Sequence, residues 1–154
     1  KVHGAAYGGG VGLACVCDHV SSNSNVKFGF TETKLGLIPS TIGPYVVGKM
    51  GEARAREVFM SANIFNELDA ERLNIVSEIS DDLDQSAEKH ITSYLKTAPK
   101  AVGEAKSLVR SLGATIDDKV IEQTIEQLAD IWEGEEARHG IESFLNKTKP
   151  RWSN

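Results

Sequence analysis

"HGAAYGGGVGLACVC" occupies residues 3–17 and is the stretch that decides the fold. An apolar run, Val2 to Ala6, leads into three consecutive glycines, and Val11 to Cys17 then has the apolar spacing of a short helix. This order predicts a strand, a tight turn and the start of a helix. The backbone N–H groups of such a turn are accessible and have the helix dipole behind them, which suits a developing oxyanion. A glycine turn needed only for close strand-to-helix packing is an equal alternative.

The same glycines do not match the two common phosphate-binding patterns. No Gly-Lys-Ser/Thr follows them, which excludes a P-loop, and the dinucleotide fingerprint needs Gly or Ala where Leu13 or Cys15 stands. A phosphate-binding role for these glycines is therefore disfavoured.

Outward from this turn, the first half of the chain mixes short extended and helical segments. Extended pieces are expected at Val20, 26–30, 35–38 and 75–79, and helices at 40–50, 52–60 and 66–72, the last capped by Asn66. From residue 83 onward the pattern is helical throughout. The expected helices are 83–95, 99–112 with Pro99 at its start and Gly113 beyond its end, 115–132 with Thr115 and Asp118 as a capping pair, and 137–145. We predict an α/β fold with an appended helical layer; the alternative is a plain helical bundle.

Composition limits the class of protein. The 154 residues have a net charge of -5 and are 40% hydrophobic, which fits one domain and argues against a basic nucleic-acid interface. No run approaches the ~18 apolar residues of a membrane span, and no signal peptide is recognisable. A cytoplasmic protein with neither a nucleic acid nor a membrane as partner is expected. The first residue, Lys1, gives the impression of a chain that starts in mid-domain.

Cysteines and histidines do not suggest a metal site. The spacing of Cys15 and Cys17 matches neither a redox pair nor half of a zinc site, so both are expected to be small core residues. The four histidines are scattered without ligand spacing. We predict no metal.

Glu32 is the second candidate functional group after the glycine turn. It is one carboxylate in a largely apolar, glycine-containing window, residues 28–39. If it faces inward, burial raises its pKa toward the range in which it can take and give a proton near neutral pH. A solvated glutamate beside Lys34 is the simpler alternative.

Two separated motifs together resemble one known family. Residues 3–10, Cys17-Asp18 and 28–39 resemble the core signature of the crotonase superfamily, the enoyl-CoA hydratases and isomerases, and residues 139–152 resemble its C-terminal helix and tail. Within the superfamily, residues 11–13, 32–39 and 42–45 look closest to bacterial methylglutaconyl-CoA hydratase-like members. The resemblance implies that residues 1–80 are the C-terminal part of a ββα superhelix whose N-terminal part is missing, and that 81–154 form a helical layer for trimers or dimers of trimers.

The resemblance also assigns roles to residues. Gly9 matches the second of two backbone donors that hold the thioester enolate, and Glu32 matches an acid-base glutamate. Positions that match substrate-binding residues are Tyr7, Gly8, Gly12, Thr31, Leu37, Pro39, Ser40 and Lys147. Ser40 is suggested to help place the water, and Lys147 to reach a CoA phosphate, often in a neighbouring subunit. Ordinary packing is the alternative for Tyr7, Gly8, Thr31, Leu37 and Pro39, and a solvated tail is the alternative for Lys147.

One departure from the family pattern bears on the reaction. Two-glutamate hydratases carry their first carboxylate where this chain has Gly12. Either Glu32 alone hydrates a 2-enoyl-CoA with an ordered water, or the reaction is the double-bond shift of a delta-isomerase. A non-catalytic fragment that keeps only the oligomerisation helices is a third alternative. The substrate is expected to be an acyl-CoA with no separate cofactor. Because losing one oxyanion donor costs ~10²–10³ in rate, the chain alone is expected to be nearly inactive.

Overall fold

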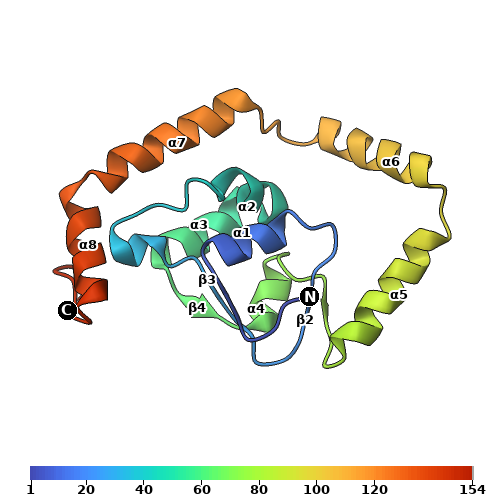
Figure 1. Cartoon of the computed structure of the whole chain (residues 1–154), viewed down its shortest axis with the longest axis horizontal. Helices are drawn as coiled ribbons and strands as arrows, with labels where there is room; N and C mark the ends of the chain where they lie inside the picture. The colour runs from blue at the N-terminus through green and yellow to red at the C-terminus, as the bar shows by residue number, and fades with distance from the viewer. Residues whose placement is uncertain (154) are drawn as a thin grey trace.

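Residues 1–153 of the chain are described by a computed structural model. They form a mixed α/β core from which a series of helices extends and then returns (Figure 1). The first half contains the elements β1 (Ala5–Tyr7), α1 (Gly9–Cys15), β2 (Ser21–Ser22), β3 (Lys27–Gly29), η1 (Glu32–Leu35), α2 (Gly43–Met50), α3 (Glu52–Ser61), β4 (Ile64–Phe65), α4 (Glu67–Arg72) and β5 (Glu78–Ile79). The second half contains α5 (Leu83–Leu95), α6 (Pro99–Leu112), α7 (Asp118–Trp132) and α8 (Glu135–Leu145).

Two small sheets organise the core. In the first, β3 lies between β1, which is parallel to it, and β4, which is antiparallel. In the second, β2 and β5 pair in parallel, with Ser21 opposite Glu78 and Ser22 opposite Ile79. Strand β5 comes from a segment far along the chain, so this second pairing joins the end of the core to its beginning.

The hydrophobic core lies between these sheets and helices α1 to α4. Phe28 and Phe30 are fully buried at its centre, and the ring of Phe28 stacks on that of Phe65 with centroids 5.9 Å apart. Burial of such aromatic side chains supplies much of the stabilisation of a core this small. The α/β fold class predicted from the sequence is confirmed.

Helices α5, α6 and α7 do not form a bundle. They run as an open arc around the core, with local contacts where α5 leaves it beside β2 and where α7 meets Ser40, and α8 packs back against η1 (Figure 1). None of the residues of α6 or α7 is buried, and Leu95 and Leu112 are each 79% exposed. The alternative of a plain helical bundle with its own core is therefore wrong. Oligomerisation through these helices stays a prediction.

Three local predictions are corrected. The first helix runs from Gly9 to Cys15, so Cys15 is buried while Cys17 lies beyond the helix and is exposed. The window 35–38 is not extended, because η1 ends at Leu35 and Gly36 turns the chain with a φ of 70°. Helix α7 is capped by Asp117, whose carboxylate accepts from the Val120 N–H at 3.0 Å, and not by Thr115. None of the described helices is both long and apolar enough to cross a membrane.

Candidate active site

The glycine turn is fixed on both sides by backbone hydrogen bonds. Gly8 follows β1 with a φ of 49°, a conformation that favours glycine, and its N–H donates to the Gly29 carbonyl at 2.9 Å. Its own carbonyl accepts from the N–H groups of Val11 and Gly12 at 3.0 and 3.1 Å. Gly9 begins α1, so its N–H lies in the first turn, where a helix offers no intrahelical acceptor. The turn thus holds a donor ready for a ligand oxygen.

Glu32 lies directly against this turn. It opens η1, and its Oε1 would be 3.0 Å from a Cβ added at Gly8, so the carboxylate contacts the backbone of the turn. Its Oε2 is buried and has no hydrogen-bond partner in the described part of the chain. Burial raises the pKa of the Glu32 carboxyl above its usual value, and a hydrogen bond within its own residue offsets part of that rise. A carboxyl in this state is suited to general acid-base work.

Helix α8 supports the segment that carries Glu32. A Cβ on Gly36 would lie 2.5 Å from the carbonyl carbon of Glu136, and a Cβ on Gly140 would meet the backbone of Leu35. From the other side, the Thr33 hydroxyl donates to the Phe59 carbonyl of α3 at 3.1 Å. This contact of α8 with η1 was not predicted from the sequence. The available signal was Gly140, an isolated glycine inside a helical pattern, which indicates a close approach of two backbones.

Gly12 is buried against Ile42, the residue that caps α2. A Cβ at position 12 would lie 2.7 Å from the Ile42 Cβ and closer still to its Cγ2. The position where two-glutamate relatives were expected to carry a carboxylate therefore has neither the carboxylate nor the space for one.

The other predicted residues fall into three places. Pro39 and Ser40 line a mainly apolar cavity of about 470 Å³ between the start of α2 and α7, together with Val47, Phe59 and Thr124. The side chains of Tyr7 and Thr31 both lie close to Gly29. Leu37, which follows η1 in the sequence, is buried. Lys147 is exposed on the tail after α8, in a left-handed turn with a φ of 54°. The structure thus places Glu32 against Gly8, while Lys147 lies in the exposed tail that follows α8.

Ser40 has both of its hydrogen-bond donors engaged. Its hydroxyl donates to the Thr124 carbonyl of α7, and its N–H donates to the Ile38 carbonyl at 2.8 Å. A hydroxyl that donates can also accept a hydrogen bond, so the hypothesis that the hydroxyl or backbone of Ser40 helps place the water stays a prediction. Its role as a lining residue of the cavity is a separate prediction.

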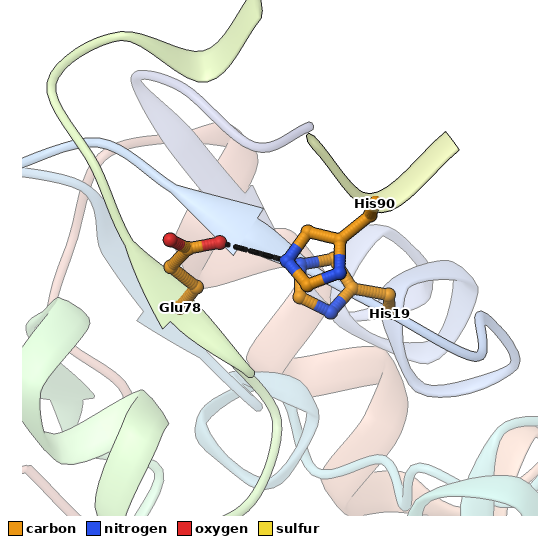
Figure 2. Close-up of side chains that lie close together, drawn as sticks. All are labelled: His19, Glu78 and His90. Atoms are coloured by element: carbon orange, nitrogen blue, oxygen red, sulfur yellow. Dashed lines mark hydrogen bonds and ion pairs between the residues drawn. The ribbon is translucent and has the colours of Figure 1, made fainter. Parts of the chain in front are cut away.

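Two of the four histidines lie together, although the sequence did not predict it. His19 and His90 stack with ring centroids 3.6 Å apart, and Glu78 faces both of them (Figure 2). The interpretation that all four histidines are scattered is therefore wrong for this pair. Spacing along the chain could not reveal it, because the pairing of β2 with β5 brings the residues together.

The Cys15 thiol is an inert core group. Burial raises its pKa to about 11, which keeps it protonated near neutral pH. This agrees with its expected place in the core.

A glycine turn that opens a helix, a half-buried glutamate set against it and an α/β core followed by helices together define a crotonase-type protein. Comparison with known families gives the particular assignment, since the model of the family described as "Enoyl-CoA hydratase/isomerase" matches residues 1–154. The chain belongs to the enoyl-CoA hydratase/isomerase family.

Individual relatives agree with this assignment. Enoyl-CoA hydratase AKT6-1 of Alternaria alternata is 30% identical, with 98% of this chain and 52% of the relative aligned. The crystal structure of an enoyl-CoA hydratase from Shewanella pealeana is 38% identical with a TM-score of 0.70, covering 97% of this chain and 57% of that one. An enoyl-CoA hydratase from Mycobacterium avium, 24% identical, shares the fold with a TM-score of 0.86 over 99% of this chain and 61% of that one. The chain thus spans a little over half the length of these relatives.

Proposed function

We propose that this protein hydrates a 2-enoyl-CoA through a thioester enolate, with Glu32 as its single acid-base residue and Gly9 as one oxyanion donor. The observation that carries the proposal is the Glu32 carboxylate, which lies against Gly8 and has a buried, unpartnered Oε2. A buried carboxylate oxygen without a hydrogen-bond partner is costly, so its position beside the glycine turn favours a role in which the carboxyl exchanges a proton. The relatives' names favour hydration over other reactions of the class.

In the proposed reaction Glu32 handles both proton movements. As a carboxylate it takes a proton from a water that adds to the β-carbon, and as an acid it returns a proton to the α-carbon. The N–H of Gly9 stabilises the negative charge that develops on the thioester oxygen between these steps. The resemblance assigns the other donor to a segment that these 154 residues do not contain. No separate cofactor takes part, since the CoA group belongs to the substrate.

A delta-isomerase is the second candidate, and the packing of Gly12 favours it. A double-bond shift needs one base that moves a proton between two carbons, and the contact with Ile42 excludes a second carboxylate at position 12 unless Ile42 moves. Hydration with a single glutamate must also orient its water, which makes it the more demanding reaction.

The acyl group and the assembly belong to the same proposal. A methylglutaconyl-CoA-like substrate rests on the resemblance of residues 11–13, 32–39 and 42–45. The apolar cavity of about 470 Å³ beside Pro39 is large enough for a branched acyl chain of this kind. Assembly into trimers or dimers of trimers would use the exposed apolar faces of α5 to α7, and Lys147 would meet a CoA phosphate in such an assembly. A cytoplasmic location completes the proposal.

The test compares Glu32→Gln with Glu67→Gln in the full-length protein, because these 154 residues alone are expected to be nearly inactive. Glu67 is a matched control because its Oε2 is also buried without a partner, but it lies on α4. Hydration of crotonyl-CoA and methylglutaconyl-CoA, and isomerisation of a 3-enoyl-CoA, are followed by the absorbance of the conjugated thioester, and acyl-CoA binding by calorimetry. We expect Glu32→Gln to lower hydration by ~10²-fold or more with binding retained, and Glu67→Gln to leave it within a few-fold of the original rate.

Three outcomes would contradict the proposal. Isomerisation without hydration would establish the second candidate. Equal losses in the two variants would remove Glu32 from its assigned role. A full-length protein that neither binds nor converts any acyl-CoA would support the non-catalytic alternative.

A further inference from the structure

A cluster of two histidines and one glutamate lies where helix α5 leaves the core. His19 precedes β2, Glu78 lies on β5 and His90 lies on α5, so three separate segments contribute one side chain each. Their side chains are 21%, 29% and 31% exposed, which leaves solvent access on one side. None of the three belongs to the residues proposed for acyl-CoA, so this cluster requires an explanation of its own.

The ligand atoms of the cluster lie at metal-binding distances from one another. One nitrogen of each imidazole and one oxygen of Glu78 all lie within 4.8 Å of one another. The His90 Nε2 is 2.9 Å and the His19 Nε2 is 3.9 Å from the Glu78 Oε2 (Figure 2). Zinc bonds of ~2.0–2.1 Å in tetrahedral geometry place neighbouring ligand atoms roughly 3.3 Å apart, which lies between these two distances. Centring an ion would also require the two imidazoles to rotate out of their stacked arrangement, so that one nitrogen of each points at the ion.

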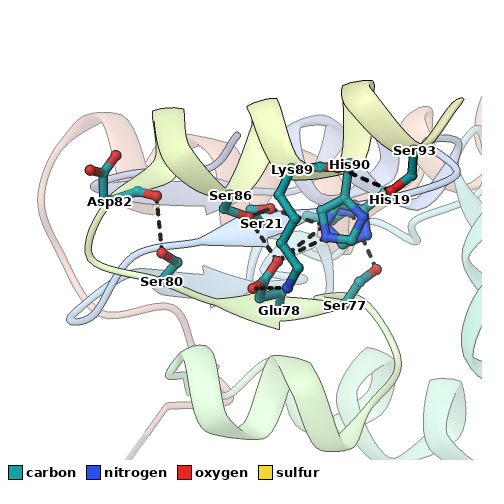
Figure 3. Close-up of polar contacts among 11 residues, drawn as sticks. His19, Ser21, Ser77, Glu78, Ser80, Asp82, Ser86, Lys89, His90 and Ser93 are labelled. Atoms are coloured by element: carbon teal, nitrogen blue, oxygen red, sulfur yellow. Dashed lines mark hydrogen bonds and ion pairs between the residues drawn. The ribbon is translucent and has the colours of Figure 1, made fainter. Parts of the chain in front are cut away.

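Serine hydroxyls hold two of the three side chains in place. The Ser86 hydroxyl donates to the Glu78 Oε2 at 2.8 Å, and Ser21 Oγ lies 2.7 Å from Ser86 Oγ and 3.0 Å from the His19 Nε2 (Figure 3). Hydrogen-bonded partners of this kind orient ligands in metal sites and tune their affinity. On metal binding, the His19 nitrogen would exchange the Ser21 hydroxyl for the ion, while Ser21 and Ser86 remain bonded to each other.

One cation already competes for the carboxylate. Lys89 Nζ lies 3.4 Å from the Glu78 Oε1, but the Lys89 side chain is 69% exposed and is free to move into solvent. Its contact uses the oxygen that does not face the imidazoles. Lys89 therefore opposes a bound dication by charge and leaves the ligand oxygen accessible.

We propose that His19, Glu78 and His90 form a three-ligand site for a divalent transition-metal ion of the zinc class, with water as the fourth ligand. Two imidazoles and one carboxylate suit zinc and exclude a preference for Mg²⁺ or Ca²⁺, which favour oxygen ligands. The site ties α5 to the β2 and β5 pair, because each of these neighbouring segments supplies part of it. Its role is structural: the ion fixes the direction in which the helical series leaves the core.

The test is zinc titration of the 154-residue chain without an affinity tag, followed by calorimetry and by the thermal midpoint, with Co²⁺ absorption as a second readout. We expect one saturable zinc per chain, a midpoint that rises with zinc, and no comparable binding of Mg²⁺. His90→Gln should weaken binding by more than the ~10- to 100-fold loss typical of removing an outer hydrogen-bonding partner, and Ser86→Ala should fall within that range. His3→Gln is the matched control, since His3 is an exposed histidine outside the cluster, and it should bind as the original chain does.

Lys89→Ala keeps the proposal testable even if a variant that lacks a ligand fails to fold. This substitution removes a competing cation without touching a ligand, so it should strengthen zinc binding. Circular dichroism without metal would establish that the His90→Gln chain is folded. The proposal is overturned if zinc does not bind saturably, if His90→Gln binds as tightly as the original chain, if His3→Gln abolishes binding, or if Lys89→Ala weakens it.

Discussion

The core, residues 1–80, and the helical series α5 to α7 contain similar apolar side chains but bury them very differently. Phe28 and Phe30 in the core are fully buried, whereas Leu95 and Leu112 in the series are 79% exposed. The helices of the series are well formed because their ends are set locally: Asp82 caps α5, Pro99 opens α6 and Asp117 caps α7. The difference shows that periodicity and caps determine where a helix forms, while tertiary contacts alone determine whether its apolar face is covered.

The largest loss of stability is expected for a substitution at the centre of the core. Phe28→Ala should lower the free energy of unfolding by about 3–5 kcal/mol, because it leaves a cavity where the Phe28 ring stacks on Phe65. Leu112→Ala should change it by about 0.5 kcal/mol or less, because this side chain packs against little. Urea unfolding of the two variants measures both values. Equal losses would mean that α6 is covered in solution.

A smaller effect is expected where the helical half returns to the core. Gly140→Ala places a Cβ against the backbone of Leu35, so α8 has to shift, and a loss of about 1–3 kcal/mol is expected. Hydrogen exchange should show weaker protection in η1 and α8. Gly103→Ala on α6 is the matched control, since nothing lies within 4 Å of its added Cβ. There alanine should stabilise the helix by about 0.5–1 kcal/mol, and a loss at Gly103 would contradict the open packing of α6.

The smallest effect on stability is expected from the charge of one carboxylate, Glu32 in the core, compared with Glu126 on α7. Because burial raises the pKa of Glu32 in the folded state, its stabilising contribution is present below the unfolded pKa of about 4.5 and is lost as pH rises through the folded pKa. Glu32→Gln should therefore raise the thermal midpoint at pH 7 and leave it nearly unchanged at pH 4. Glu126→Gln on the exposed surface of α7 serves as the control and should show no such pH-dependent gain. A gain that persists at pH 4 would mean that the stabilisation does not come from ionisation.

Local features of the fold were predictable, and non-local contacts were not. The Asn66 cap is present as expected, with its side chain accepting from the Asp69 N–H at 3.0 Å, and Pro99 opens α6. Cys17 was misplaced because α1 ends two residues earlier than predicted, at Cys15, which leaves Cys17 in solvent. The conformation of η1 depends on Gly36, whose left-handed turn has no counterpart in hydrophobic spacing.

In the candidate site, too, the local features could be predicted from the sequence and the long-range contacts could not. The glycine turn and Glu32 could be chosen from the sequence, because a triple glycine before a helix and a lone carboxylate in an apolar window are local patterns. The support of Glu32 by α8 required contacts between residues about a hundred positions apart, such as Gly140 and Leu35. The stacking of His19 on His90 likewise depends on strand pairing that no spacing rule describes.

The contact between Gly12 and Ile42 constrains the order in which this chain could change. A glutamate introduced at position 12 first would force apart helices α1 and α2, whereas a smaller residue introduced first at position 42 would make room for it. The two positions are therefore epistatic: the same substitution is harmful in one background and tolerated in the other. A change from one carboxylate to two in this site therefore requires a substitution of Ile42 first.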